Sequence, residues 1–126
     1  MALTSRDSCD AAAHRMPVFE EIDDARCRSF QSYIELVGRR WTPGILLGGM
    51  RGATRFGEYR SFVAGISDRL LAQRLRELET AGLMERVVTP TTPVTIEYLL
   101  TDRGRRLMQI LRPLVEWGLE ADDQAY

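Results

Sequence analysis

The hydrophobic period of the chain changes at Gly82, and this change limits the folds that the chain can adopt. Before the glycine, the segment GISDRLLAQRLRELE places Leu71, Leu75 and Leu78 on one face of a helix. After it, LMERVVT and VTIEYLL are rich in β-branched residues, and the turn sequence PTTP separates them. The pattern therefore predicts a helix capped by Ser67 that leads directly into a β-hairpin.

Helical spacing also predicts helices before this one. Asp23 or Asp24 is the expected N-cap of the first, which ends before residue 38. The second has Thr42 in the N-cap place and Pro43 at N1, and we expect it to break at the Gly48–Gly49 pair. A third short helix follows, with Phe56 and Tyr59 on its apolar side.

A last helix follows the hairpin, with Thr101 as its cap and with Pro113 expected to kink or divide it. Four helices, a hairpin and a helix make a mainly α (α+β) chain, and the order is that of a winged helix-turn-helix with a two-stranded wing and extra N- and C-terminal helices. Residues 1–22 are polar and lack periodicity, which predicts a flexible tail. Residues 23–126 then form one DNA-binding and dimerisation domain, a function that the charge pattern supports.

The net charge of −1 conceals a basic block in the middle of the chain. All 17 basic residues are arginines, and residues 39–76 hold eight of them against two acids, a net charge of +6. The flanking segments 1–38 and 77–126 carry −3 and −4. A basic block within an acidic chain is the distribution that attracts a polyanion such as DNA.

The helix after Ser67 directs Arg69, Gln73 and Arg76 away from its leucine stripe, with no acid among them. In a helix-turn-helix, the second helix lies in the major groove with its N-terminal residues at the base edges. Arginine pairs there with guanine and glutamine with adenine. We expect DNA contacts from these three residues, from the start of their helix and from the flanking elements: Arg55, Ser67, Asp68, Arg69, Gln73, Arg76, Arg86, Thr91 and Thr92.

The flanking residues have less specific roles. Arg55 is a candidate phosphate clamp at the start of the preceding helix, and its alternative is a surface salt bridge to Glu58. Arg86 lies at the base of the wing as a second phosphate contact. Thr91 and Thr92 form the tip of the hairpin, and because this tip is neutral we expect it to add little affinity.

The ordered set of motifs resembles the HxlR-type winged-helix transcriptional regulators. The resemblance runs from about residue 27 to 118 and rests on GRRWTPGILLGGMRGATRFGEYR, GISDRLLAQRLRELETAGLMER, PVTIEYLLTDRGRRL and VEWG. It implies a cytoplasmic homodimer, paired through the helix near residues 24–37 and the C-terminal helix. It also implies binding to double-stranded operator DNA at inverted repeats, most often as a repressor.

The two terminal helices carry more apolar residues than a small winged-helix core can cover. We therefore expect them to form a two-fold interface. The candidate interface residues are Phe30, Tyr33, Leu107, Leu111, Leu114 and Trp117.

Some relatives in this family sense oxidants or electrophiles through a cysteine near the start of the first helix, which makes Cys27 the candidate sensor. The family spacing before Trp41 falls on Arg28, one residue further along. Arg26, Arg28 and the helix N-terminus favour the thiolate, whereas two nearby aspartates oppose it. The alternative is an inert, half-buried packing residue. Cys9 in the tail is a candidate resolving thiol.

Other classes of function fit the sequence less well. His14 is the one histidine, and no cluster has metal-ligand spacing, so we expect neither an enzyme nor a metal or cofactor site. We expect no membrane span and no secretory signal. Two alternatives stay open: a winged-helix module that binds proteins, and a regulator controlled by a small ligand held between the dimerisation helices.

Overall fold

The computed structural model describes residues 17–125, and the chain divides into two units between Val37 and Gly38. The first unit contains α2 (Pro17–Glu20), a single turn within the expected tail, and α3 (Asp24–Val37). Asp23 caps α3, because its carboxylate accepts a hydrogen bond of 2.8 Å from the Arg26 N–H. No residue of α3 is buried.

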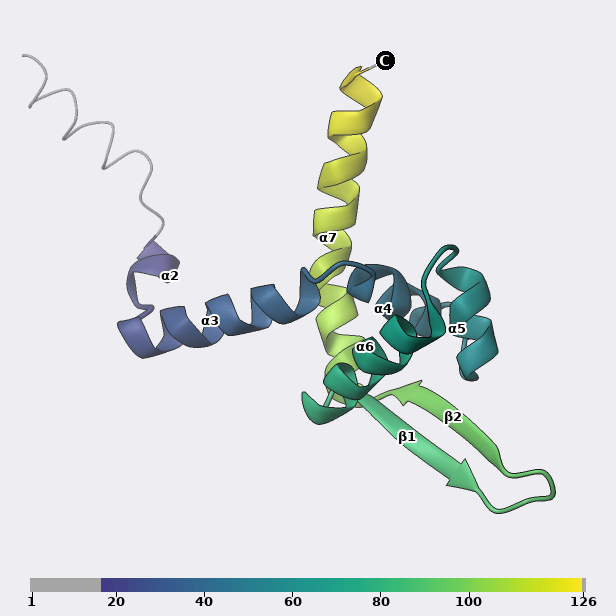
Figure 1. Cartoon of the computed structure of the whole chain (residues 1–126). Helices are drawn as coiled ribbons and strands as arrows, with labels where there is room; N and C mark the ends of the chain where they lie inside the picture. The colour runs from purple at the N-terminus through teal and green to yellow at the C-terminus, as the bar shows by residue number, and fades with distance from the viewer. Residues whose placement is uncertain (1–16, 126) are drawn as a thin grey trace, which may run out of the picture. The chain divides into compact units, whose positions relative to one another are not determined.

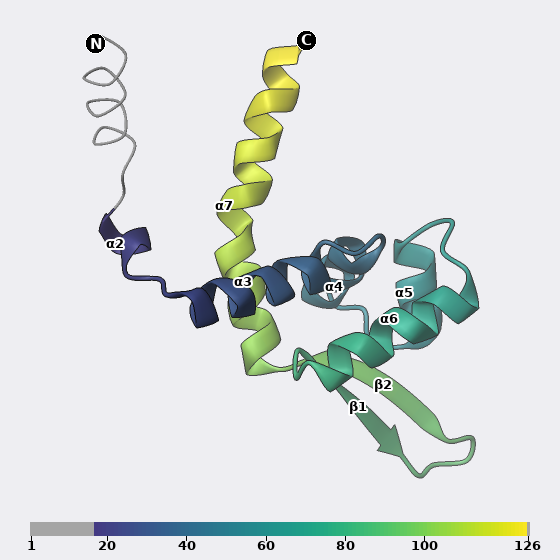
Figure 2. The same cartoon turned by 60° about the vertical axis from the view of Figure 1, so that its left-hand side comes forward.

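The second unit contains three helices, a hairpin and a long last helix. The elements are α4 (Thr42–Met50), α5 (Phe56–Phe62), α6 (Asp68–Thr80), β1 (Met84–Thr89), β2 (Thr95–Leu100) and α7 (Asp102–Ala125) (Figure 1). The two strands are antiparallel, with Met84 opposite Leu100 and Thr89 opposite Thr95. The hairpin projects from the C-terminal end of α6 (Figure 2). This is the predicted winged helix-turn-helix.

The core of the second unit lies between α4, α5, α6 and the base of the hairpin. The predicted leucine stripe of α6 is fully buried at Leu71, Leu75 and Leu78. The remaining buried apolar side chains are Ile45, Leu46, Tyr59, Val63, Ile66, Leu83, Met84 and Leu100. Burial of this apolar surface is what stabilises the fold, since each fully buried side chain of this size contributes about 1.5–3 kcal/mol.

Helix α4 departs from the sequence prediction at both ends. Its N-cap is Trp41 in the left-handed conformation (φ 79°), and Thr42 is the buried first residue of the helix, so the assignment of Thr42 as cap is wrong. The predicted break at the Gly48–Gly49 pair is also wrong, because α4 continues through both glycines to Met50.

The two glycines are close-approach positions. A Cβ atom on Gly48 would lie 3.1 Å from the ring of Phe62, and one on Gly49 would lie 3.1 Å from the side chain of Leu100. The missing side chains therefore let α5 and β2 pack directly on the α4 backbone. Tertiary packing outweighs the weak helix propensity of glycine here.

The other helix ends follow local chemistry as predicted. Ser67 Oγ accepts a hydrogen bond of 3.2 Å from the Leu70 N–H, and Thr101 Oγ1 accepts one of 3.1 Å from the Gly104 N–H. Pro113 does not divide α7, which is continuous over 24 residues. Proline removes only one backbone donor, and both Pro113 and Gln109 are exposed, so water can hydrate the carbonyl that loses its partner.

Candidate nucleic-acid interface

Helix α6 presents a basic, exposed face opposite its buried leucine stripe. Arg69, Gln73 and Arg76 are all exposed and follow one another at helical spacing. Within residues 17–125, no ion pair or hydrogen bond engages the guanidinium of Arg69 or Arg76. The structure thus brings the three predicted base-reading side chains together on one surface, where they can hydrogen-bond to an external acceptor.

The side chains at the start of α6 are engaged within the protein. Ser67 holds the first turn as its cap. The carboxylate of Asp68 lies 3.1 Å from Arg60 of α5, an ion pair in which both side chains are mostly exposed. This pair joins the two helices of the helix-turn-helix at their solvent side and offsets the acidic charge at the start of α6.

Arg55 is the exposed N-cap residue of α5. The Glu58 side chain caps α5. Its Oε1 accepts hydrogen bonds from the backbone N–H of Arg55 (2.9 Å) and of Thr54 (3.1 Å). These two bonds, with one from the Thr54 hydroxyl, lower the pKa of Glu58. No ion pair between the Arg55 guanidinium and Glu58 occurs among the residues that the structure describes, so the cap replaces the alternative salt bridge.

Two hydrogen bonds hold the base of the wing against the start of α5. Tyr59 Oη donates a hydrogen bond of 2.8 Å to the Tyr98 carbonyl, and the Tyr98 N–H donates one of 2.6 Å to Thr54, which fixes β2 on the start of α5. Arg86 of β1 is exposed opposite Tyr98.

The tip of the wing carries the two predicted threonines, and both are exposed. The Thr91 hydroxyl donates a hydrogen bond of 2.8 Å to the Pro93 carbonyl, so it stabilises the tip itself. The Thr91 N–H also donates to the Thr89 carbonyl, so the exposed Thr92 side chain, which has no hydrogen bond among the described residues, is the part available for an outside contact.

Two arginines of the basic block have defined places that the sequence pattern does not single out. The Arg51 guanidinium lies 5.6 Å from the ring centroid of Phe62, a cation–π contact beside α5. Arg74 of α6 is only 14% exposed and pairs with Glu77. Its position next to the buried Leu75 and its spacing of three residues from Glu77 are the signals that indicate this internal role.

The candidate sensor Cys27 lies in the first turn of α3 and is exposed. Its backbone N–H donates a hydrogen bond to the Asp23 carbonyl, as expected near a helix start. In this single chain the Cys27 side chain packs against no core, and both predicted roles, sensor and packing residue, stay predictions. Cys9 lies outside the described residues.

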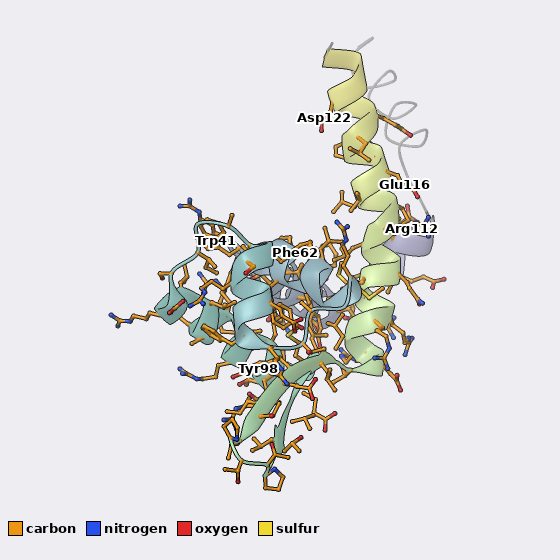
Figure 3. All side chains as sticks on the ribbon, turned by 90° about the vertical axis from the view of Figure 1, so that its right-hand side faces the viewer. Trp41, Phe62, Tyr98, Arg112, Glu116 and Asp122 are labelled. Carbon is orange, nitrogen blue, oxygen red and sulfur yellow. The ribbon has the colours of Figure 1, made fainter. Side chains whose placement is uncertain are left out.

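The predicted dimer residues are apolar and largely exposed. Phe30 and Trp117 are 63% and 66% exposed, Tyr33 and Leu114 are also exposed, and Leu107 and Leu111 are half-buried. Ile110 and Leu119 extend the apolar surface of α7. The outer half of α7 extends beyond the other elements of its unit, with Glu116 and Asp122 on it (Figure 3).

The arrangement of three helices followed by a wing, with an arginine-rich exposed face on the third helix, is that of a nucleic-acid-binding domain. The family model described as HxlR-like helix-turn-helix matches residues 36–126. The chain belongs to the HxlR-like helix-turn-helix family. The predicted family is therefore confirmed, and the protein is a helix-turn-helix transcriptional regulator.

Curated relatives in this family align over most of the chain. The HTH-type transcriptional regulator YvaP of Bacillus subtilis (strain 168) is 37% identical over 100 residues, which are 79% of this chain and 93% of YvaP. The HTH-type transcriptional regulator YodB of the same organism is 37% identical over 92 residues, which are 73% of this chain and 82% of YodB.

Solved structures agree with the fold. The redox regulator HypR in its reduced form superposes with a TM-score of 0.70 at 32% identity, over 78% of this chain and 99% of HypR. Diamide-treated YodB from B. subtilis gives a TM-score of 0.65 at 37% identity, over 71% of this chain and 89% of YodB.

Among the residues that the structure describes, no helix combines the length and the apolar composition that a membrane crossing requires. No group of three or more His, Cys, Asp or Glu side chains among them is placed to hold a metal ion.

Proposed function

We propose that the protein is a cytoplasmic homodimer that binds double-stranded operator DNA at an inverted repeat and represses transcription. The observation that carries the proposal is the exposed face of α6, which holds Arg69, Gln73 and Arg76 without a partner among the described residues. A two-fold dimer directs one such helix to each half-site, with half-sites about 10 base pairs apart or a multiple of that spacing. A dimer bound across a promoter excludes the polymerase.

In this proposal the contacts divide into two groups. Arg69 and Gln73, in the first two turns of α6, read base edges, and Arg76 extends the face along the groove. Arg55 and Arg86 contact phosphates, and the tip at Thr91 and Thr92 approaches the DNA from the wing. Ser67 and Asp68 set the start of α6 through the cap and the pair with Arg60.

The dimer surface in this proposal consists of the apolar residues on the two terminal helices. Within α3 the exposed Phe30 and Tyr33, and within α7 the exposed Leu114 and Trp117, support it, because large exposed apolar side chains that gather on one helix often mark an interface. The same surface is the place where an effector would act on the spacing of the two α6 helices.

The regulatory signal in this proposal is oxidation at Cys27. The exposure of this thiol supports it, as do two similar proteins, one described as a redox regulator and one solved after diamide treatment. Diamide takes two electrons and two protons from two thiols, which join as a disulfide while the reagent becomes the hydrazine. The chain has two cysteines, so the second thiol is Cys9 or the Cys27 of the other protomer.

Binding to a duplex selected by the protein from a random pool, and to a scrambled duplex, tests DNA recognition. Arg69→Ala and Gln73→Ala should each cost about 1–3 kcal/mol on the selected duplex and less on the scrambled one. Arg55→Ala should weaken binding to both equally, because it loses a phosphate contact. Gln109→Ala on α7 is the matched control. An equal loss on both duplexes for Arg69→Ala would show that this face does not read bases.

The redox hypothesis is tested by DNA binding of the wild type, Cys27→Ser and Cys9→Ser, each with and without diamide. We expect diamide to release the wild type and to leave Cys27→Ser bound. If Cys9→Ser is also resistant, the disulfide joins the two residues. If diamide leaves wild-type binding unchanged, the thiol hypothesis is wrong and a small ligand between the dimerisation helices takes its place.

A further inference from the structure

A carboxylate on the inner side of α6 joins this helix to the segment that precedes α4. Glu77 Oε2 lies 2.6 Å from Arg39 Nη1, and Glu77 Oε1 lies 2.7 Å from Arg74 Nη1. Burial raises the pKa of Glu77, but the hydrogen bond from Arg39 and the charges of Arg74 and Arg39 outweigh it, so the pKa is lowered. The carboxylate is therefore charged and holds two cations at once.

Arg74 completes the connection from the other side. Its Nε donates a hydrogen bond of 3.1 Å to the Arg40 carbonyl. One carboxylate and two guanidinium groups thus make three polar contacts, of which Arg39–Glu77 and Arg74–Arg40 join α6 to residues 39–40, and we call this group the α6 clamp. Two of its side chains are largely buried, at 18% exposed for Glu77 and 14% for Arg74.

The residue that follows the clamp is held in an unfavourable backbone conformation. Trp41 has a φ of 79°, and a bulky residue adopts this left-handed conformation only where its surroundings fix it. The Arg40 guanidinium lies 4.6 Å from the Trp41 ring centroid. The ring also packs near Gly65, whose added Cβ would lie 3.6 Å from Trp41 Cη2. Trp41 therefore contacts the turn between α5 and α6 while the clamp holds the preceding two residues.

We infer that Glu77 is a positioning residue for DNA recognition: with Arg39 and Arg74 it fixes residues 39–41 to α6 and so sets the orientation in which α6 presents its basic face. Helix α4 begins directly after this segment, at Thr42, so the clamp also fixes the start of α4 on α6. The chain passes from α3 to α4 through the same residues. This role rests on the proposed function, because α6 must read DNA for its orientation to matter.

The clamp differs from the other ion pairs of the second unit. Arg60–Asp68 and Arg112–Glu116 join side chains that are each more than half exposed, and such pairs contribute little because water screens them. Removal of one partner from a largely buried group leaves the others without compensation and has a larger effect. Glu77 has two partners, of which Arg74 is largely buried and Arg39 is 48% exposed, and its loss opens all contacts of the clamp except the Arg74–Arg40 bond.

The test compares Glu77→Gln with Glu79→Gln, an exposed glutamate two residues further along α6. The first readout is amide hydrogen exchange at Thr42 and Ile45, whose N–H groups donate to Arg39 and Trp41. For Glu77→Gln we expect exchange at these two amides to be about tenfold faster, the size expected for loss of one hydrogen bond between charged groups. We expect no change in the hairpin, and no change anywhere for Glu79→Gln.

The second readout is binding to the selected and scrambled duplexes. Glu77→Gln should lose about tenfold on the selected duplex and less on the scrambled one, because base contacts need the correct helix orientation whereas phosphate contacts tolerate change. Arg39→Gln should act in the same direction, and it leaves every α6 residue intact, so the test does not depend on Glu77→Gln alone.

The outcomes separate this inference from the proposed function. If Glu77→Gln and Arg39→Gln match Glu79→Gln in exchange and in duplex preference, the clamp has no positioning role. If exchange rises equally in the hairpin, Glu77 stabilises the whole domain and the inference is overturned. If Arg69→Ala leaves duplex preference unchanged, the base-reading role of α6 fails, and the local exchange still decides whether the clamp fixes residues 39–41.

Discussion

Two single residues decide how the helices and the wing join. Tyr59 is fully buried, and its hydroxyl satisfies the Tyr98 carbonyl on the side of β2 that faces away from β1. Gly104 lies in the first turn of α7, where an added Cβ would lie 2.2 Å from the Leu83 carbonyl oxygen. Tyr59 acts through the hydroxyl group that it supplies. Gly104 acts because it has no Cβ atom.

Gly104→Ala should lower the free energy of unfolding by about 2–4 kcal/mol, because the contact is with backbone and only a shift of α7 or of the Leu83 segment relieves it. Urea denaturation measures the loss. The matched control is Gly57→Ala in α5, where nothing lies within 4 Å of the added Cβ and alanine favours the helix by roughly 0.5–1 kcal/mol. Equal effects of the two substitutions would contradict the close contact at Gly104.

Tyr59 should make the protein sensitive to alkaline pH. Burial, with a smaller contribution from the charge of Glu58, raises the pKa of Tyr59 to about 12 from the value of 10.0 in the unfolded chain. The folded state binds the proton more tightly, so this stabilisation is complete below pH 10. It is lost as the pH rises toward 12, by roughly 2 kcal/mol.

Urea denaturation at pH 9 and pH 11.5 measures this loss, with Tyr59→Phe as the reference. The variant should be about 1–3 kcal/mol less stable at pH 9, because the Tyr98 carbonyl loses its donor. It should also lose less stability than the wild type between the two pH values. Parallel behaviour of the two proteins would assign the alkaline sensitivity to other groups.

At the scale of elements, the sequence predicts what local chemistry decides. Ser67 and Thr101 cap their helices as expected, because a cap needs only a hydroxyl and the next turn of backbone. The Gly48–Gly49 pair and the left-handed Trp41 depend on packing partners that the local pattern does not contain. The local sequence pattern does not predict the α6 clamp either, because Arg39 and Glu77 are 38 residues apart.

The cap at Ser67 should set the stability of the first turn of α6. Ser67→Ala removes the acceptor for the Leu70 N–H and should lower the free energy of unfolding by about 1 kcal/mol. Ser67→Asp keeps an acceptor in the same place and should be close to wild type in urea denaturation. If the alanine and aspartate variants are equally destabilised, the serine acts through another contact.

At the scale of the whole molecule, α7 has two different sides in its outer half. Ile110, Leu114 and Trp117 follow at i, i+4 and i+7 and are all exposed. Arg112 and Glu116 form an ion pair of 3.3 Å on another side of the helix, where both lie in Figure 3. Val115 and Leu119 lie next to this pair and are also exposed, so apolar side chains continue around α7, and a helix of this kind that extends beyond its own core needs a second surface to cover them.

We expect the wild type to sediment as a dimer at micromolar concentration and the double variant Leu114→Asp with Trp117→Arg to sediment as a monomer. The charges would have to be buried without partners in the interface, which is unfavourable.

Loss of the second α6 should weaken binding to a duplex with two half-sites by about a hundredfold or more, because the second contact is no longer intramolecular. Binding to a duplex with one half-site should change little, since the basic face of α6 is untouched. Glu116→Gln, in the ion pair with Arg112, is the control and should remain a dimer. A wild type that sediments as a monomer, or a double variant that keeps the preference for two half-sites, would show that α7 does not carry the interface.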